Sequence, residues 1–200
     1  MVEYQSYTGA QIQEVLPDVA GLRIRVFRDY PYLYDGNRAY EEHYLQGLAR
    51  NERSLVAVAR VDGAVVAAAT ALPLGNDAEI LAGIDRQFAK LGLDARDYYY
   101  YSEIVVDAAH RGRGIAREFY RRRRDRAIAL GYRKVCFAAI VREPGVLPAP
   151  ADYFDPAPMW TALGFVQHPD ISVTFRWPTL TPAGTQEIDH RLVFWLSDLG

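Results

Sequence analysis

The strand–turn–helix–strand unit near the middle of this sequence constrains its fold more than any other segment. YYYYSEIVVD (98–107) is rich in strand-forming residues, and RGRG (111–114) follows it as a glycine-rich turn. Residues 115–130 are predicted to form a helix that Gly131 closes, and KVCFAAI (134–140) is again typical of a strand. A strand, a helix and a second strand in succession favour a parallel strand pair joined by a crossover helix.

The glycine-rich turn has the features of an anion-binding site. The first amides of a helix have no partners inside the helix, and the helix dipole is positive there. Gly112 and Gly114 let a ligand approach the backbone closely. A glycine-rich turn between a strand and a helix N-terminus therefore favours phosphate binding. The alternative is a structural turn with a helix cap.

The remaining segments mix helices and strands. A hairpin is predicted over 54–74, where two β-rich runs flank Asp62-Gly63, a pair suited to a tight turn. The Pro, Gly, Asn and Asp content predicts loops over 29–37 and 141–158. The other predicted helices are 8–28, bent or broken at Pro17, 39–50, 77–91 and 158–163. The other predicted strands are 2–7, 165–177 and 188–197. We therefore expect one mixed α/β domain over residues 1–200, and a capping box formed by Thr8 and Gln11.

Positive charge is concentrated in one part of the chain. HRGRGIAREFYRRRRDR (110–126) holds eight arginines, yet the net charge of the whole chain is −2. A duplex-binding domain is more often basic over a whole face, so we expect no nucleic-acid partner. Arg121–Arg124 point to all sides of a helix and cannot form one stripe. A solvated face is the first interpretation of these four residues, and attraction of a ligand phosphate is the alternative.

The composition is that of a soluble protein. The single cysteine, Cys136, excludes an internal disulfide and suits a reducing compartment. The N-terminal residues lack a signal-peptide pattern, and the longest apolar run (64–74) is far shorter than the roughly 20 residues of a membrane span. We expect a cytoplasmic protein without a membrane partner. No cluster of His, Cys and Asp suggests a metal.

Two motifs resemble those of a known family. Arg111 to Ala116 matches R/Q-x-x-G-x-G/A, the cofactor loop of the GNAT superfamily of acyl-CoA-dependent N-acetyltransferases, and WTALGFV (160–166) is similar to a later family segment. The resemblance implies a mixed, mostly antiparallel central sheet flanked by helices, with one splayed parallel strand pair. It also implies acetyl-CoA as co-substrate and a primary amine of a small molecule or peptide as acceptor.

The resemblance assigns residues to acetyl-CoA. The pyrophosphate would be held at the glycine-rich turn, and the pantetheine arm would pair with the preceding strand as an added strand. The turn residues are Arg111, Gly112, Arg113, Gly114, Ile115 and Ala116, and the strand residues are Val105 and Val106.

Catalytic residues are less well defined. Glu103 is our candidate general base, because it lies in an apolar strand that approaches the cofactor. A carboxylate satisfied across the sheet is the equal alternative. Many family members place a tyrosine where this chain has Trp160, and an indole cannot act as an acid at neutral pH. Tyr153 is then the nearest candidate acid, although packing is an alternative role.

The segment between the first two predicted helices is the candidate acceptor side. In this fold the first two helices and their connection wall the acceptor site, which here brings in DYPYLYDGNRAYEEHY (29–44) with Tyr32 and Tyr34. Its acidic and aromatic side chains would suit a cationic amine, through charge pairing and cation–π contact. The alternative is that the tyrosines only pack and the acids only face solvent. A non-catalytic acyl-CoA sensor, a nucleic-acid binder and an acyl-lactone synthase are the competing functions, and the late strands would suit a homodimer.

Overall fold

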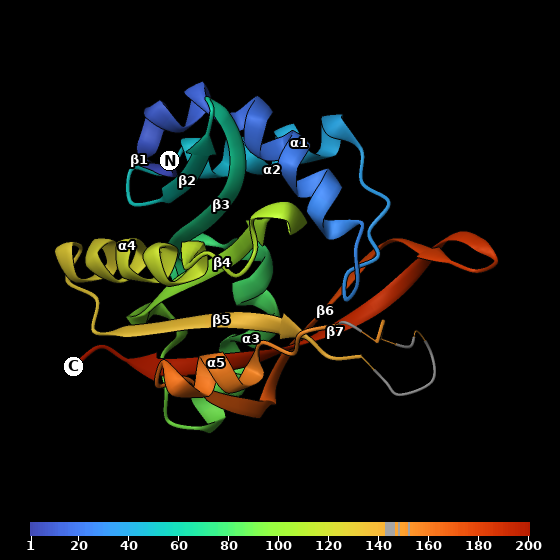
Figure 1. Cartoon of the computed structure of the whole chain (residues 1–200). Coiled ribbons are helices and arrows are strands. Elements are labelled where there is room, and N and C mark those ends of the chain that lie inside the picture. The colour runs from blue at the N-terminus through green and yellow to red at the C-terminus, as the bar shows by residue number, and fades with distance from the viewer. Residues whose placement is uncertain (143–146, 148, 152) are drawn as a thin grey trace.

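One sheet organises the part of the chain that the computed structural model describes, which is residues 1–142, 147, 149–151 and 153–200. Its strand order is β1-β2-β3-β4-β5-β7-β6, and neighbouring strands are antiparallel except for β4 and β5 (Figure 1). The strands are β1 (Glu3–Tyr7), β2 (Leu55–Val61), β3 (Ala64–Pro73), β4 (Tyr98–Val106), β5 (Lys134–Ile140), β6 (Val166–Thr181) and β7 (Gly184–Asp198). The mixed, mostly antiparallel sheet with one parallel pair is therefore confirmed.

Five α-helices flank this sheet in the described part of the chain. They are α1 (Leu16–Phe27), α2 (Arg38–Ala49), α3 (Ala78–Lys90), α4 (Ile115–Ala129) and α5 (Ala157–Ala162). The first three bury residues such as Val19, Leu45 and Phe88 against one face, and α4 and α5 cover the other face. Helix α4 is the predicted crossover between the parallel strands, and it packs over β2, β3 and β4.

The hairpin expected over 54–74 is present. Asp62 and Gly63 both have positive φ angles, of 50° and 81°, which suits a two-residue turn between twisted strands. The expected helix over 8–28 is instead a 3₁₀ turn (Gly9–Glu14) followed by α1, and Pro17 lies in the first turn of α1. Proline is tolerated there because an amide of the first turn has no intrahelical acceptor.

The predicted capping box is wrong. Thr8 makes no side-chain cap, and its main-chain carbonyl accepts the N–H of Gln11 at 3.2 Å. The segment that follows is a 3₁₀ turn rather than an α-helix, so the local hydrogen bond spans three residues.

The last two strands are longer than predicted. We expected the first of them to end near 177 and the second to begin near 188. Instead Trp177 pairs with Ile188 and Thr181 with Gly184. Pro178 is compatible with an edge strand, and β6 lies at the edge of the sheet. Part of the predicted loop 141–158, residues 143–146, 148 and 152, lies outside the described residues.

Candidate functional site

The glycine-rich turn after β4 is open to solvent. Gly112 and Gly114 have φ angles of +74° and +79°, and a Cβ atom on either would have no neighbour within 4 Å. The glycines are therefore required by the backbone conformation and not by crowding. Gly114 is the N-cap of α4 and offers no side chain to its first amides. Arg111 to Gly114 are all exposed, so main-chain N–H groups face water at the positive end of the helix.

The two parallel strands separate beside this turn. β4 and β5 pair only from Tyr98 with Lys134 to Tyr100 with Cys136. Beyond Tyr100, β4 continues along β3, while β5 continues along β7 as far as Ile140. Over the second half of β4, the main-chain groups that face β5 therefore have no strand partner among the described residues.

Main-chain alternation decides which residues face this gap. Asp107 donates its N–H to the carbonyl of Val66 on β3 at 2.9 Å, so Val106 presents its main-chain groups to the open side. Its carbonyl accepts from Nε of Arg111 at 3.1 Å. By the same alternation Val105 faces β3 and Ile104 faces the gap. Sequence reasoning named Val105 and Val106, and missed Ile104 because the alternation needs the register of a neighbouring strand.

A bulge in β4 determines the direction of Glu103. Thr70 pairs with Glu103 and Leu72 with Tyr100, so two residues of β4 lie opposite one residue of β3. Tyr101 packs on the face covered by α4, and strict alternation would place Glu103 on that same face. Because of the bulge, Glu103 instead reaches α1 on the other face.

Glu103 belongs to a buried ion cluster. Arg23 of α1 pairs with both Glu103 and Glu41 of α2, and the three side chains are at most 9% exposed. The Arg23 guanidinium also lies over the rings of Tyr44 and Phe27, at 4.6 and 5.0 Å from their centroids. Two carboxylates share one cation, and one oxygen of each has no hydrogen-bond partner among the described residues. The cluster therefore contains two carboxyl groups for one guanidinium.

The acids and tyrosines of the 29–44 segment differ in burial and in their contacts. Glu41 of α2 is fully buried, whereas its chain neighbour Tyr40 is 57% exposed. Burial and the charge of Glu41 both raise the pKa of the Tyr34 hydroxyl. Tyr32 packs against Phe27 with ring centroids 4.6 Å apart, and burial raises its pKa to about 12.

Trp160, at the family's tyrosine position, and Tyr153, the candidate acid, pack against different parts of the protein. Trp160 packs against Phe137 and Trp195, with ring centroids 4.8 and 5.2 Å away, on the face covered by α5. Tyr153 packs edge-on against Tyr30 at 4.7 Å, and burial raises the pKa of its hydroxyl. Its observed contact is thus with the connection between α1 and α2 (residues 28–37), as in the packing role left open above.

The arginines of α4 do not form one solvated face. Arg121 is exposed and pairs with Glu118 and Asp125, each at 2.7 Å. Arg123 is buried, lies 4.4 Å over the ring of Tyr101, and donates to the carbonyl of Glu103 at 3.3 Å. Burial lowers its pKa to about 10. The expectation of a solvated face thus fails for Arg123, because α4 lies flat on the sheet and one position of any four must face inward.

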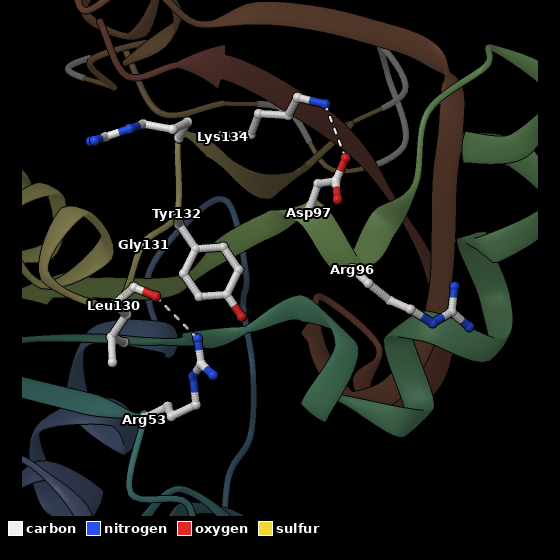
Figure 2. A pocket seen from close by; sticks show the side chains of 8 residues that line it. Arg53, Arg96, Asp97, Leu130, Gly131, Tyr132 and Lys134 are labelled. Carbon is white, nitrogen blue, oxygen red and sulfur yellow. Dashed lines mark hydrogen bonds and ion pairs between the residues drawn. The ribbon is translucent and has the colours of Figure 1, made fainter.

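A second depression lies at the opposite end of the parallel strands. Its lining includes Arg53, Arg96, Tyr132 and Lys134, and Figure 2 shows that their charged groups do not converge. Lys134 pairs with Asp97 at 3.1 Å, and Arg53 donates to the carbonyl of Leu130 at 3.3 Å. Because these cations already have partners within the protein, the glycine-rich turn is the better candidate for an anion site.

Comparisons with known proteins agree with this geometry. Residues 22–151 match the model of the acetyltransferase (GNAT) family. An N-acetyltransferase from Staphylococcus aureus Mu50 superposes with a TM-score of 0.60 at 16% identity, covering 99% of both chains. The yncA protein of Salmonella typhimurium, solved with its cofactor acetyl-CoA, has a TM-score of 0.58 at 14% identity and covers 99% of this chain and 95% of its own.

The ribosomal-protein-S18-alanine N-acetyltransferase of Escherichia coli is also similar. Its TM-score is 0.56 at 13% identity, with coverage of 100% of this chain and 95% of its own. At these identities the solved structures establish the fold. The search of curated proteins finds no match. In the described part of the chain, no helix is long and apolar enough to cross a membrane, and no group of His, Cys, Asp and Glu residues could hold a metal ion.

Proposed function

Because the chain belongs to the GNAT acetyltransferase family, we propose that it transfers an acetyl group from acetyl-CoA to a primary amine of a small molecule or peptide. The observation that carries the proposal is the exposed glycine-rich turn at the N-terminus of α4, beside the point where β4 and β5 separate. When bound, acetyl-CoA supplies the acyl group as a thioester. The protein supplies the binding groups, the base and the walls.

The turn and β4 would hold the two ends of acetyl-CoA. Main-chain N–H groups from Gly112 to Ala116 suit a pyrophosphate, because they lie at a helix N-terminus without a side-chain cap. Main-chain groups of Val106 and Ile104 suit the extended pantetheine arm, because they face the gap. Binding would then displace Arg111 from the Val106 carbonyl and leave its charge near the phosphates.

Glu103 would take the proton of the acceptor amine. An amine must be neutral to attack a thioester, and a positioned carboxylate can accept its proton. The second carboxyl group of the Arg23–Glu41–Glu103 cluster favours a cationic acceptor over a neutral or anionic one. Tyr34, whose hydroxyl pKa is raised by burial and by the charge of Glu41, is the acceptor-side candidate at this cluster. Tyr32 would serve mainly as packing.

The thiolate has no evident acid on the α5 face. Trp160 occupies the family tyrosine position and donates only through its indole N–H. Tyr153 contacts the α1–α2 connection and would act as a wall of the acceptor side. Protonation of the leaving thiolate by solvent is therefore the simplest route for this chain.

The test is release of free thiol from acetyl-CoA in the presence of amines. The panel contains an alkyl diamine, a polyamine, an amino acid, and peptides with a free N-terminus or a lysine. Cys136 adds little background, because it is fully buried and burial raises the pKa of its thiol. We expect thiol release with at least one cationic amine and little with uncharged acceptors.

A non-catalytic acyl-CoA sensor is the second candidate, and the packing of Trp160 favours it. Such a protein would gain thermal stability from acetyl-CoA while no amine released thiol. Absence of both stabilisation and turnover would reject the sensor and the transferase together.

A further inference from the structure

A buried hydrogen-bond network joins three distant segments on the acceptor side. Arg142 follows the end of β5, and its guanidinium donates to the main-chain carbonyls of Pro31 and Tyr32 in the α1–α2 connection. The bond to Tyr32 is 3.0 Å long. The remaining nitrogen, Nη1, lies 2.8 Å from Nδ1 of His190 on β7.

The partners of His190 define its protonation state. An arginine donates and never accepts, so Nδ1 of His190 must be the acceptor in the bond with Arg142. The ring is therefore neutral and carries its proton on Nε2, which donates to Oγ1 of Thr179 at 2.7 Å. The Thr179 hydroxyl in turn donates to the carbonyl of Trp177 at 3.0 Å.

The surroundings of His190 favour the same neutral state. The side chain is 3% exposed and stacks on Trp177, with ring centroids 3.8 Å apart. The charge of Arg142 opposes a second positive charge beside it, and the neighbouring acid on β7, Asp189, is engaged with Arg176 at 3.8 Å. The other titratable groups near Arg142 are the hydroxyls of Tyr30 and Tyr32. Burial and Arg142 together lower the pKa of His190 to about 4.

The segment that this network holds leads to the candidate base. Leu180 donates its N–H to the carbonyl of Leu33 at 2.7 Å, and Asp35 donates to the carbonyl of Pro178 at 2.9 Å. Figure 1 shows the α1–α2 connection, in blue, running beside β6 and β7, in red. Tyr34 lies between Leu33 and Asp35 in the chain, and the charge of Glu41, the acid that shares Arg23 with Glu103, raises the pKa of its hydroxyl.

We propose that Arg142 is a positioning residue of the acceptor site, and that neutral His190 holds it in the geometry that fixes the α1–α2 connection beside the Glu103 cluster. The inference rests on the proposed function for the identity of the acceptor side. Neither side chain touches the acceptor in this scheme. Arg142 acts through the carbonyls of Pro31 and Tyr32, and His190 acts through Arg142.

The test compares Arg142→Gln with three further variants. His190→Gln keeps a neutral acceptor for Arg142 and a donor for Thr179, whereas His190→Ala removes both. Arg86→Gln is the matched control, because Arg86 is an exposed arginine on α3, an element outside the network. Two measurements are made on each protein. One is hydrogen–deuterium exchange of residues 29–37. The other is steady-state kinetics with acetyl-CoA and the amine that gives the fastest thiol release.

We expect Arg142→Gln and His190→Ala to speed exchange over residues 29–37 and to raise the acceptor KM about tenfold, the effect of losing one charge-assisted hydrogen bond. The acetyl-CoA KM should change by less than about twofold, because the glycine-rich turn lies outside the network. His190→Gln should restore both properties toward the unmodified protein, and Arg86→Gln should leave both unchanged.

Several results overturn the proposal. Unchanged exchange over residues 29–37 in Arg142→Gln does so whether or not the protein turns over any amine. So does an unchanged acceptor KM, an equal fall in affinity for both substrates, or a His190→Gln variant as impaired as His190→Ala. If the unmodified protein releases no thiol with any amine, the proposed function fails, and the exchange measurement still decides whether Arg142 positions the connection.

Discussion

The role of the Glu103 side chain depends on the residues around it. A carboxylate in an apolar strand is either a base or a structural partner, and here it pairs with a buried arginine that a second acid shares. A base in this environment needs the acceptor ammonium to complete the charge balance. Kinetic measurements, rather than the position of Glu103 alone, distinguish a catalytic base from a structural partner.

At this scale we predict the effect of Glu103→Gln. The amide retains an acceptor for Arg23 but cannot take a proton, so kcat should fall by about 10²–10⁴-fold. The dissociation constant for acetyl-CoA should not change, and thermal unfolding should show a folded protein. Glu14→Gln, at an exposed position remote from the cluster, is the control. Loss of less than about threefold in kcat would assign Glu103 a structural role only.

Helix α4 is the element on which cofactor binding depends. Glycines with positive φ stand at both of its ends, with Gly114 before the first turn and Gly131 after the last. Neither position has an atom within 4 Å of an added Cβ, so a side chain would strain the backbone without creating a clash. The two ends are therefore matched in backbone strain and differ in what lies beside them.

This match gives a prediction for the element. Gly114→Ala and Gly131→Ala should each lower the free energy of unfolding by about 1–2 kcal/mol, because both force a side chain into the left-handed region. Only Gly114→Ala should weaken acetyl-CoA binding, by about tenfold or more, since it alone alters the turn that would hold the phosphates. Calorimetric titration measures both. Equal effects of the two variants on acetyl-CoA affinity would argue against the turn as the binding site.

At the scale of the whole molecule, long-range polar contacts hold the acceptor side to the sheet. The network of Arg142 and His190 ties β5, β7 and the α1–α2 connection together. A group that must stay neutral in the folded state makes stability depend on pH.

The sign of this dependence follows from the pKa of His190. Its value is about 4 in the folded protein and 6.5 for a free imidazole, so the unfolded chain binds the proton more readily. The contribution of His190 to stability is complete above pH 6.5 and is lost as the pH falls toward 4. Thermal unfolding between pH 7.5 and 4.5 should show a steeper decline for the unmodified protein than for His190→Gln. Parallel curves for the two proteins would contradict this assignment.

The sequence by itself determined the features that depend on local geometry. The turn at residues 111–114, the crossover helix after it and the hairpin at Asp62-Gly63 were all predicted, because glycine conformations and helix ends are encoded within a few residues. The same locality let two short motifs indicate the family. Locality also explains the errors, since the full length of β6 and β7 depends on their pairing with each other at the edge of the sheet.

Only the tertiary structure decided which side chains meet. The bulge in β4, where two residues lie opposite one residue of β3, directs Glu103 to the α1 face. Arg23, Glu41 and Glu103 come from three separate elements, and Arg142 reaches carbonyls more than one hundred residues away. No periodicity in the chain encodes such contacts, because they depend on strand register and on the packing of distant elements.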